Sequence, residues 1–377
     1  MIIRIDPTGT TDGFRTILKE MSGVDDINGL LILACDENGF SPETVDDLLK
    51  SVSVPLFGGV FPGIIHDRKS LKRGTIVAGL GIRPSVHVIR GLSGVPLDYD
   101  REMAPLMAKT GKGKTIFVFV DGYSQGISGL IDSLYDNLGL QVNYLGGGAG
   151  SINPAALDMT KKPCLFTNDG LVKDSAVLAV TPMQSGVGAA HGWHKIQGPF
   201  KVTGSSGNAI TSLDWRPAFE VYEEIISEHS GKTISRENFF DIAKCYPLGI
   251  SRLGAEIIVR DPFTMEGDAI VVATEIPRES FIDILTGDRE SIVEAAGKSR
   301  DAAMNAFRGR KKDAIMLIDC ISRALFLGDG FPREIEAVCQ DGVPLIGVLS
   351  LGEIANSGES FMELYNKTCV VGILGES

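Results

Sequence analysis

Two charged residues in the C-terminal part of the chain have the types and spacing to bind a small charged molecule. Arg323 follows Cys320 by three residues, past the apolar run 316–318, and Glu353 follows the apolar run 344–351. A guanidinium can hold a carboxylate through two parallel hydrogen bonds, and a carboxylate at the rim of an apolar sheet can hold an ammonium group. The pair therefore suits an amino-acid zwitterion; the alternative is that Arg323 and Glu353 pair with each other.

A glycine run offers a second kind of contact. Gly146, Gly147 and Gly148 begin a five-residue run after an apolar strand. A bare backbone can approach a ligand closely and offer N–H groups to an anion. The alternative is a tight corner that needs positive φ. The run is not a dinucleotide fingerprint, because Ser151 takes the place of the last glycine and Pro154 prevents an immediate helix.

Other polar residues offer little support for catalysis or metal binding. A nucleophilic thiol at Cys320 needs a base, and none of the five histidines is placed locally as its partner. In a strand, His191 and His194 would point to opposite faces, which disfavours joint chelation. Asp121 and Tyr123 follow a strand and either contact a ligand or cap a turn. We therefore predict no catalytic residue, metal ligand or cofactor, and the alternative is an enzyme that uses Cys320, Arg323 and Glu353.

The elements that position these residues recur three times. Residues 31–63, 116–151 and 316–353 each contain an apolar strand, an amphipathic helix, a second apolar strand and glycines at the expected corner. A length of about 30 residues is typical of a strand–helix–strand unit with parallel strands. Between the second and third copies the pattern predicts a hairpin at 195–213 and a helix at 217–228. A long helix is expected at 289–307.

Composition limits the class of protein. The 377 residues are 44% hydrophobic and carry a net charge of −12, which favours a globular chain and disfavours nucleic-acid binding. No apolar run is long enough for a membrane span, and the N-terminus lacks a signal-peptide layout. The six cysteines include no Cys-x-x-Cys pair, so we expect a reducing, cytoplasmic location. The predicted fold is α/β, with two lobes and mixed sheets built from repeated strand–helix–strand units plus hairpins.

Several short motifs occur in a characteristic order. They are Asp121-Gly122, Gly146 to Gly150, Gly192-Trp193, Val202-Thr203, Asp214-Trp215-Arg216-Pro217-Ala218 with Tyr222, Cys320-x-x-Arg323, Gly352-Glu353-Ile354 and Asn366-x-Thr368. In this order the chain resembles the FIST proteins, over roughly residues 25 to 374. The resemblance implies an N-terminal domain at 1–213 and a C-terminal domain at 214–377. Trp215, Ile64 and Tyr365 depart from residues usual in that family, which are a glycine, an acid and a histidine.

The resemblance implies a sensory domain of signal transduction that binds a small polar molecule, amino acids among the suggestions. A haem-bound nitric-oxide sensor is the alternative, because some members are described so. We expect the ligand in a cleft between the halves and a separate signalling protein as partner, with no nucleic acid and no membrane. The predicted ligand-binding residues are Arg323, Glu353, Gly352, Gly146, Gly147, Gly148, Asp121, Tyr123, Ser322, Cys320 and Asn366.

Overall fold

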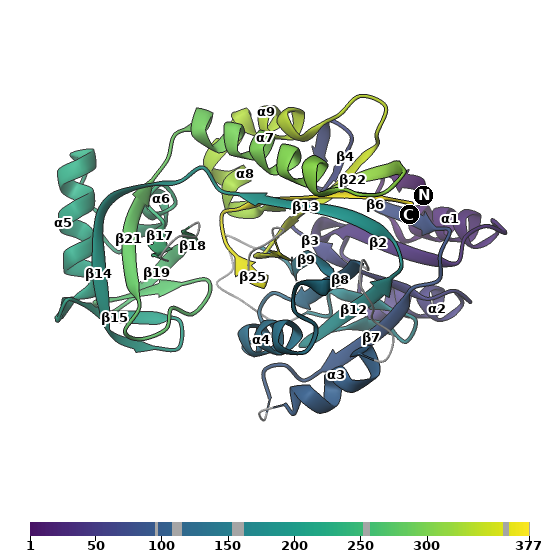
Figure 1. Cartoon of the computed structure of the whole chain (residues 1–377), viewed down its shortest axis with the longest axis horizontal. Helices are drawn as coiled ribbons and strands as arrows, with labels where there is room; N and C mark the ends of the chain where they lie inside the picture. The colour runs from purple at the N-terminus through teal and green to yellow at the C-terminus, as the bar shows by residue number, and fades with distance from the viewer. Residues whose placement is uncertain (95–96, 108–114, 153–161, 252–256, 357–361, 377) are drawn as a thin grey trace.

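The chain folds into two lobes of unequal size. The computed structural model describes residues 1–94, 97–107, 115–152, 162–251, 257–356 and 362–376. Figure 1 shows a larger body, in which both termini lie close together, and a smaller lobe formed by residues 194–286. The α/β class with mixed sheets is as predicted. Among the described helices, none is long and apolar enough to cross a membrane.

The three predicted copies are real structural repeats. In each, two parallel strands are joined by helix and run through the core as apolar segments, which is typical of strands buried on both faces. The registers agree: Ile32 pairs with Gly58, Val118 with Gly146 and Leu317 with Gly347. The elements are β2 (Gly29–Cys35), α2 (Pro42–Lys50) and β3 (Leu56–Phe61); β8 (Thr115–Asp121), α4 (Ile127–Leu138) and β9 (Asn143–Ala149); β22 (Lys311–Cys320), α8 (Ile321–Leu327), α9 (Phe331–Val338) and β23 (Leu345–Ser350). Short 3-10 turns are η1 (Asp36–Asn38), η2 (Gly139–Gln141) and η3 (Gly328–Gly330).

Each copy carries the same two antiparallel strands on one side. One strand pairs with the first strand of the unit, and an edge strand pairs with that one in turn. In the first two copies a helix connects the edge strand directly to the first strand of the unit. In the third copy the corresponding helix comes after an inserted lobe. These elements are β6 (Thr75–Leu80), β12 (Ser175–Thr181) and β26 (Cys369–Glu376); the edge strands β1 (Ile2–Asp6), β7 (Ser85–Arg90) and β13 (Gln184–Ala190); and the helices α1 (Thr11–Ser22), α3 (Tyr99–Met107) and α7 (Arg289–Ala306).

The copies are interlocked by exchanged hairpins. The hairpin that follows the second parallel strand of one copy adds to the sheet of another: the first copy's to β23, the second's to β3 and the third's to β9. The exchange closes a three-membered cycle, and three six-stranded sheets with one strand order result. The hairpins are β4 (Gly63–His66) with β5 (Lys69–Leu71), β10 (Leu165–Thr167) with β11 (Gly170–Val172), and β24 (Glu353–Asn356) with β25 (Met362–Tyr365).

The smaller lobe is an insertion in the third copy, between β13 and α7. It has an eight-stranded sheet and its own apolar core. The predicted hairpin and helix occur there as β14 with β15 and as α5. The predicted boundary at residue 213 falls inside this lobe, so the two lobes do not follow the two sequence domains. The elements are β14 (His194–Ser206), β15 (Ala209–Leu213), β16 (Arg216–Pro217), α5 (Ala218–Ser230), α6 (Phe239–Ala243), β17 (Leu248–Ile250), β18 (Ile258–Arg260), β19 (Pro262–Glu266), β20 (Ala269–Val272) and β21 (Phe281–Thr286).

Candidate functional site

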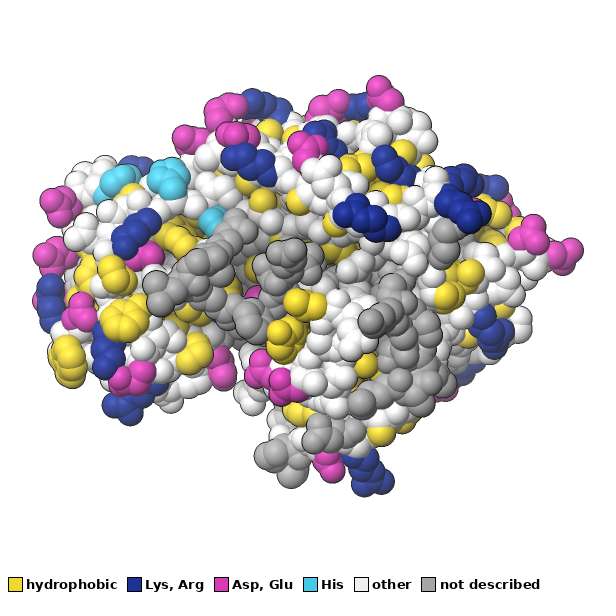
Figure 2. Space-filling view, in the orientation of Figure 1, with side chains coloured by type: hydrophobic (Ala, Val, Ile, Leu, Met, Phe, Trp, Pro, Cys, Tyr) yellow, Lys and Arg dark blue, Asp and Glu magenta, His cyan; other side chains and the backbone are white. Residues whose placement is uncertain are grey.

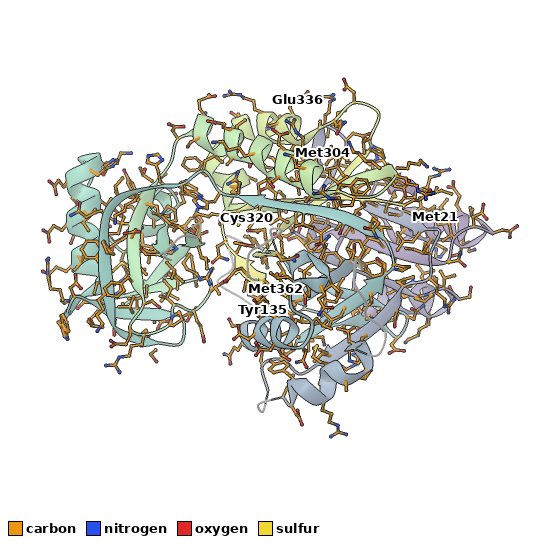
Figure 3. All side chains as sticks on the ribbon, in the orientation of Figure 1. Met21, Tyr135, Met304, Cys320, Glu336 and Met362 are labelled. Carbon is orange, nitrogen blue, oxygen red and sulfur yellow. The ribbon has the colours of Figure 1, made fainter. Side chains whose placement is uncertain are left out.

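Glu353 lies at the centre of a buried polar cluster at the carboxyl ends of β22 and β23. Cys320 and Ser350 end these strands as register partners. The Ser350 hydroxyl donates to Glu353 Oε1 at 2.7 Å, and the backbone N–H of Thr368 donates to Oε2 at 3.2 Å. Figure 3 shows Cys320 near the junction of the body with the smaller lobe. The sequence motifs that contain Cys320, Glu353 and Thr368 therefore meet in space.

Burial controls the protonation of this cluster. It raises the pKa of Glu353 to about 8, against the opposing effect of the hydrogen bonds from Ser350 and Thr368. The pKa of the Cys320 thiol is also well above its usual value, because of burial first and of the nearby Glu353 carboxylate second. A neutral thiol is a poor nucleophile. The cluster therefore has the chemistry of a binding or proton-holding site, and the geometry gives no support to Cys320 as a nucleophile.

Arg323 is fully buried and does not pair with Glu353. Its Nε donates to Glu334 Oε1 at 2.9 Å, Nη2 donates to the same oxygen, and Asp319 Oδ1 lies 3.3 Å from Nε. The alternative of an Arg323–Glu353 ion pair is therefore wrong: the carboxylate partners are Glu334 and Asp319. The other acceptors of the guanidinium are the backbone oxygens of His191, Ile292 and Lys367. A ligand carboxylate would have to displace protein acceptors, so the clamp at Arg323 stays a prediction.

A second set of polar contacts joins the smaller lobe to the body. Asp261, directly after β18, accepts a hydrogen bond from Ser322 at 2.5 Å and lies 3.2 Å from the ammonium of Lys367. The Lys367 ammonium also donates to the Lys244 backbone oxygen and lies 5.2 Å from the centre of the Trp193 ring. Lys367 is fully buried, and Ser322 is half-buried. Lys367 thus contacts Asp261 and Lys244 of the smaller lobe. The next residue, Thr368, donates to Glu353.

We call Asp261, Ser322, Glu353, Asn366 and Lys367 the interlobe cluster. Asn366 is almost fully buried, and its Oδ1 has no hydrogen-bond partner among the described residues. Sequence reasoning identified three of the five and missed Asp261 and Lys367. Lys367 occupies the variable position of the motif Asn366-x-Thr368, and its only signal was a positive charge beside an apolar strand.

The predicted glycine corner is a strand. Gly146, Gly147 and Gly148 lie inside β9, which is paired on both sides, by β8 and by β24. The N–H of Gly148 donates to the backbone oxygen of Gly352 at 2.8 Å. The expectation of free N–H donors for an anion is therefore wrong at Gly148, because sheet hydrogen bonds use them. The run does border Glu353, which is the register partner of Gly147.

Asp121 and Tyr123 belong to a different junction. The Asp121 carboxylate accepts hydrogen bonds from the backbone N–H groups of Tyr123 at 3.1 Å and of Asp174 at 2.7 Å. The Tyr123 hydroxyl donates to the backbone oxygen of Ser151 at 2.6 Å. These contacts fit the structural alternative, in which Asp121 caps a turn. The structure does not bring either residue into contact with Arg323 through any described hydrogen bond or ion pair.

Comparison with known proteins agrees with the motifs. The model of the FIST N domain matches residues 29–216, and the model of the FIST C domain matches residues 218–356. The chain belongs to the FIST family. FIST domains are generally described as sensory domains of signal transduction. A search among curated proteins finds no match.

Three residues that depart from the FIST pattern have clear places in the structure. Ile64 is fully buried in β4, opposite Val348 of β23. Tyr365 is the register partner of Glu353 on β25. Trp215 has a φ of 63° and is 79% exposed. A glycine is usual at such a φ, since an L side chain is strained there.

The two histidines of the haem alternative do not converge. His191 lies just before β14, so the argument from strand periodicity does not apply to it. Its Nδ1 accepts a hydrogen bond from the backbone N–H of Trp193 at 2.9 Å. Burial, and then the nearby Arg323 charge, lower the pKa of His191 to about 4, so the ring is neutral at pH 7. His194 is exposed at the start of the strand.

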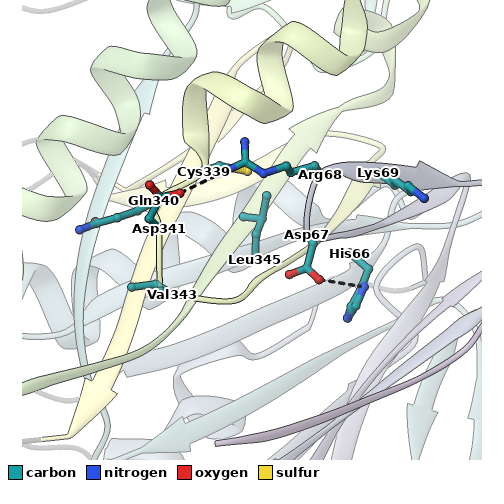
Figure 4. Close-up of a pocket in the computed structure, with 10 residues that line it drawn as sticks. His66, Asp67, Arg68, Lys69, Cys339, Gln340, Asp341, Val343 and Leu345 are labelled. Carbon is teal, nitrogen blue, oxygen red and sulfur yellow. Dashed lines mark hydrogen bonds and ion pairs between the residues drawn. The ribbon is translucent and has the colours of Figure 1, made fainter.

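A surface pocket of about 470 Å³ lies away from the predicted residues (Figure 4). The turn between β4 and β5 forms one wall, and the loop after α9 forms the other. Arg68 spans the two walls through Glu336 and Asp341. Because Arg68 already pairs with Asp341, and because the pocket contains none of the motif residues, we place the candidate site at the interlobe cluster.

Proposed function

We propose that this FIST protein is a cytoplasmic sensory module that binds a small polar metabolite, such as an amino acid, at the interlobe cluster. A separate signalling protein would receive the output. All six cysteines are free thiols, which supports a reducing compartment. In the view of Figure 2, basic and acidic side chains are interspersed, which gives no support to nucleic-acid binding on that face.

The observation that carries the proposal is that the buried interlobe cluster has more hydrogen-bond acceptors than donors. Asn366 Oδ1 lacks a donor among the described residues, and Glu353 is held by only neutral donors. A ligand ammonium group would donate to Asn366 Oδ1, and it would neutralise Glu353 in place of the proton that this carboxyl group holds at pH 7. Lys367, whose carboxylate partner among the described residues is Asp261, supplies the cation for a ligand carboxylate. In this proposal Lys367 replaces Arg323 as the anion-binding residue.

The attachment of the smaller lobe supports a signalling role. Its first and last strands are paired where they leave the body, with His194 opposite Thr286, so the lobe is tethered at one place. Polar contacts through Asp261 and Arg260 hold it at a second place: Arg260 Nη1 donates to the Leu364 backbone oxygen at 3.0 Å. A lobe with one tether and a polar interface is suited to hinge motion. A ligand that competes for Lys367 would change how the lobe is held.

The test is thermal stabilisation by a panel of the twenty L-amino acids, measured on the full chain. We expect at least one amino acid to raise Tm, by an amount that grows with its concentration relative to Kd. Glu353→Gln and Asn366→Leu should each abolish that rise. Ser206→Ala, on the exposed end of β14, is the control and should keep it. No rise with any amino acid would contradict the proposal. A stoichiometric haem absorption band in the purified protein would instead favour the gas-sensor alternative.

A further inference from the structure

We propose that Asp319, Glu334 and Cys369 form a binding site for one divalent cation with affinity for sulfur, such as Zn²⁺. This inference does not rest on the proposed function. The three side chains come from different elements: Asp319 from β22, Glu334 from α9 and Cys369 from β26. Their ligand atoms all lie within 4.8 Å of one another, and all three side chains are fully buried.

The sheet and the crossover helix create this proximity. Asp319 and Cys369 are register partners on the neighbouring antiparallel strands β22 and β26. Glu334 reaches them from α9, which covers this sheet. Asp319 is also the one charged residue in the apolar run 314–320. A carboxylate in such a place is costly to bury unless a cation or a proton neutralises it.

One oxygen of each carboxylate in the cluster is not engaged by Arg323. Among the described residues, Asp319 Oδ2 and Glu334 Oε2 have no hydrogen-bond partner, whereas Asp319 Oδ1 lies 3.3 Å from Arg323 Nε. Glu334 Oε1, in contrast, accepts from Arg323. With the sulfur of Cys369, the three residues offer one oxygen from each carboxylate and one sulfur. Three protein ligands of this kind suit Zn²⁺ with its fourth position open, and a sulfur ligand disfavours Mg²⁺ and Ca²⁺.

The charge balance also fits a divalent cation. Two carboxylates and a thiolate carry three negative charges, and Arg323 supplies one positive charge. A divalent cation would bring the buried site to neutrality. Arg323 would then have the role of an outer partner, since it fixes the orientation of Glu334 while leaving Oε2 free. The competing state has a proton on Asp319 and a neutral thiol, and it leaves at least one carboxylate oxygen without a donor.

The test is metal content and Co²⁺ spectroscopy of the full chain. We expect close to one equivalent of Zn²⁺ per chain after exposure to Zn²⁺ and removal of loosely bound ions. Replacement by Co²⁺ should give a thiolate-to-cobalt charge-transfer band. Cys369→Ser should lose that band and most of the bound metal. Cys164→Ser is the control, because Cys164 is similarly buried but lies outside this sheet, and it should keep both.

The spectrum of the unmodified protein remains decisive if Cys369→Ser fails to fold, because the band itself reports a thiolate ligand. Asp319→Asn, a neutral replacement of the same shape, should lower the metal content as well. The proposal is overturned if no metal remains bound, if Co²⁺ gives no charge-transfer band, or if Cys164→Ser loses the metal as completely as Cys369→Ser.

Discussion

Arg323 and Glu334 form a fully buried ion pair between the two helices that join β22 to β23. Nε of Arg323 lies 2.9 Å from Glu334 Oε1, and both side chains have no solvent exposure. Burial alone would lower the pKa of the guanidinium, but the charges of Glu334 and Asp319 raise it overall, so Arg323 is always charged. A charge so placed is structural in the unliganded protein, whatever else it does.

Arg323→Ala should destabilise the protein by about 3–5 kcal/mol, because it leaves the buried Glu334 carboxylate without its cation. The measurement is urea-induced unfolding at pH 7. Arg333→Ala is the matched control: Arg333 pairs with Glu290, but both side chains are more than half exposed, so its loss should cost less than about 1 kcal/mol. A loss below about 1 kcal/mol for Arg323→Ala would show that the buried pair is not structural.

Glu353 should make stability depend on pH. Its pKa rises from the ordinary 4.5 to about 8 in the folded protein, so the folded state holds a proton that the unfolded state releases. This contribution to stability is full below pH 4.5 and is lost as the pH rises towards 8, by up to about 1.4 kcal/mol per pH unit. Glu353→Gln removes that dependence, so its stability relative to the unmodified protein should rise between pH 5 and pH 8.

The measurement is the free energy of unfolding of both proteins at several pH values. Taking the difference matters, because burial also raises the pKa of Asp319 and that group contributes with the same sign. Equal pH profiles for the two proteins would mean that Glu353 is ionised in the folded state throughout this range.

Asp261 and Lys367 should be energetically coupled across the two lobes. Either Asp261→Asn or Lys367→Met leaves a buried charge with fewer partners, and the double variant leaves neither charge. We therefore expect a coupling energy of about 1–3 kcal/mol in a double-mutant cycle that compares the free energies of unfolding of the single and double variants. The exposed pair of Glu294 and Lys298 on α7 is the control, with about 0.3–0.5 kcal/mol. Additive effects at Asp261 and Lys367 would show that this contact does not hold the lobe.

The sequence predicted the repeats well because each copy carries its own local signals. Apolar runs, helix periods and glycines recur at similar spacings, and the registers of Gly58, Gly146 and Gly347 confirm the equivalence. The exchange of hairpins could not be predicted, since strand pairing between copies depends on contacts far apart in the chain. The insertion was predicted as elements but not as a separate lobe for the same reason.

The candidate site was predicted in part. The motifs with Cys320, Glu353 and Asn366 do converge: Cys320 ends β22, Glu353 follows the neighbouring strand β23, and Asn366 follows Tyr365, the register partner of Glu353. The partners of Arg323 were not predicted, since Glu334 is eleven residues away on a helix whose orientation the spacing does not determine. The glycine run was assigned to a corner because glycine also favours positive φ. In β9 the reason for glycine is close packing instead.

Gly146 allows a test of that packing argument. A Cβ at this position would lie 1.9 Å from the backbone oxygen of Val118, on the adjacent parallel strand, and nothing flexible could move aside. Gly146→Ala should therefore destabilise the protein by about 3 kcal/mol or more, the upper range for overpacking in a core. Gly297→Ala is the control, with an expected effect on stability of opposite sign. Gly297 lies inside α7, and a methyl group added there would have no atom outside its own helix backbone within 4 Å, so alanine should stabilise by up to about 1 kcal/mol. Thermal unfolding of the two variants checks both signs, and a stable Gly146→Ala protein would mean that β8 and β9 are less closely packed than their register requires.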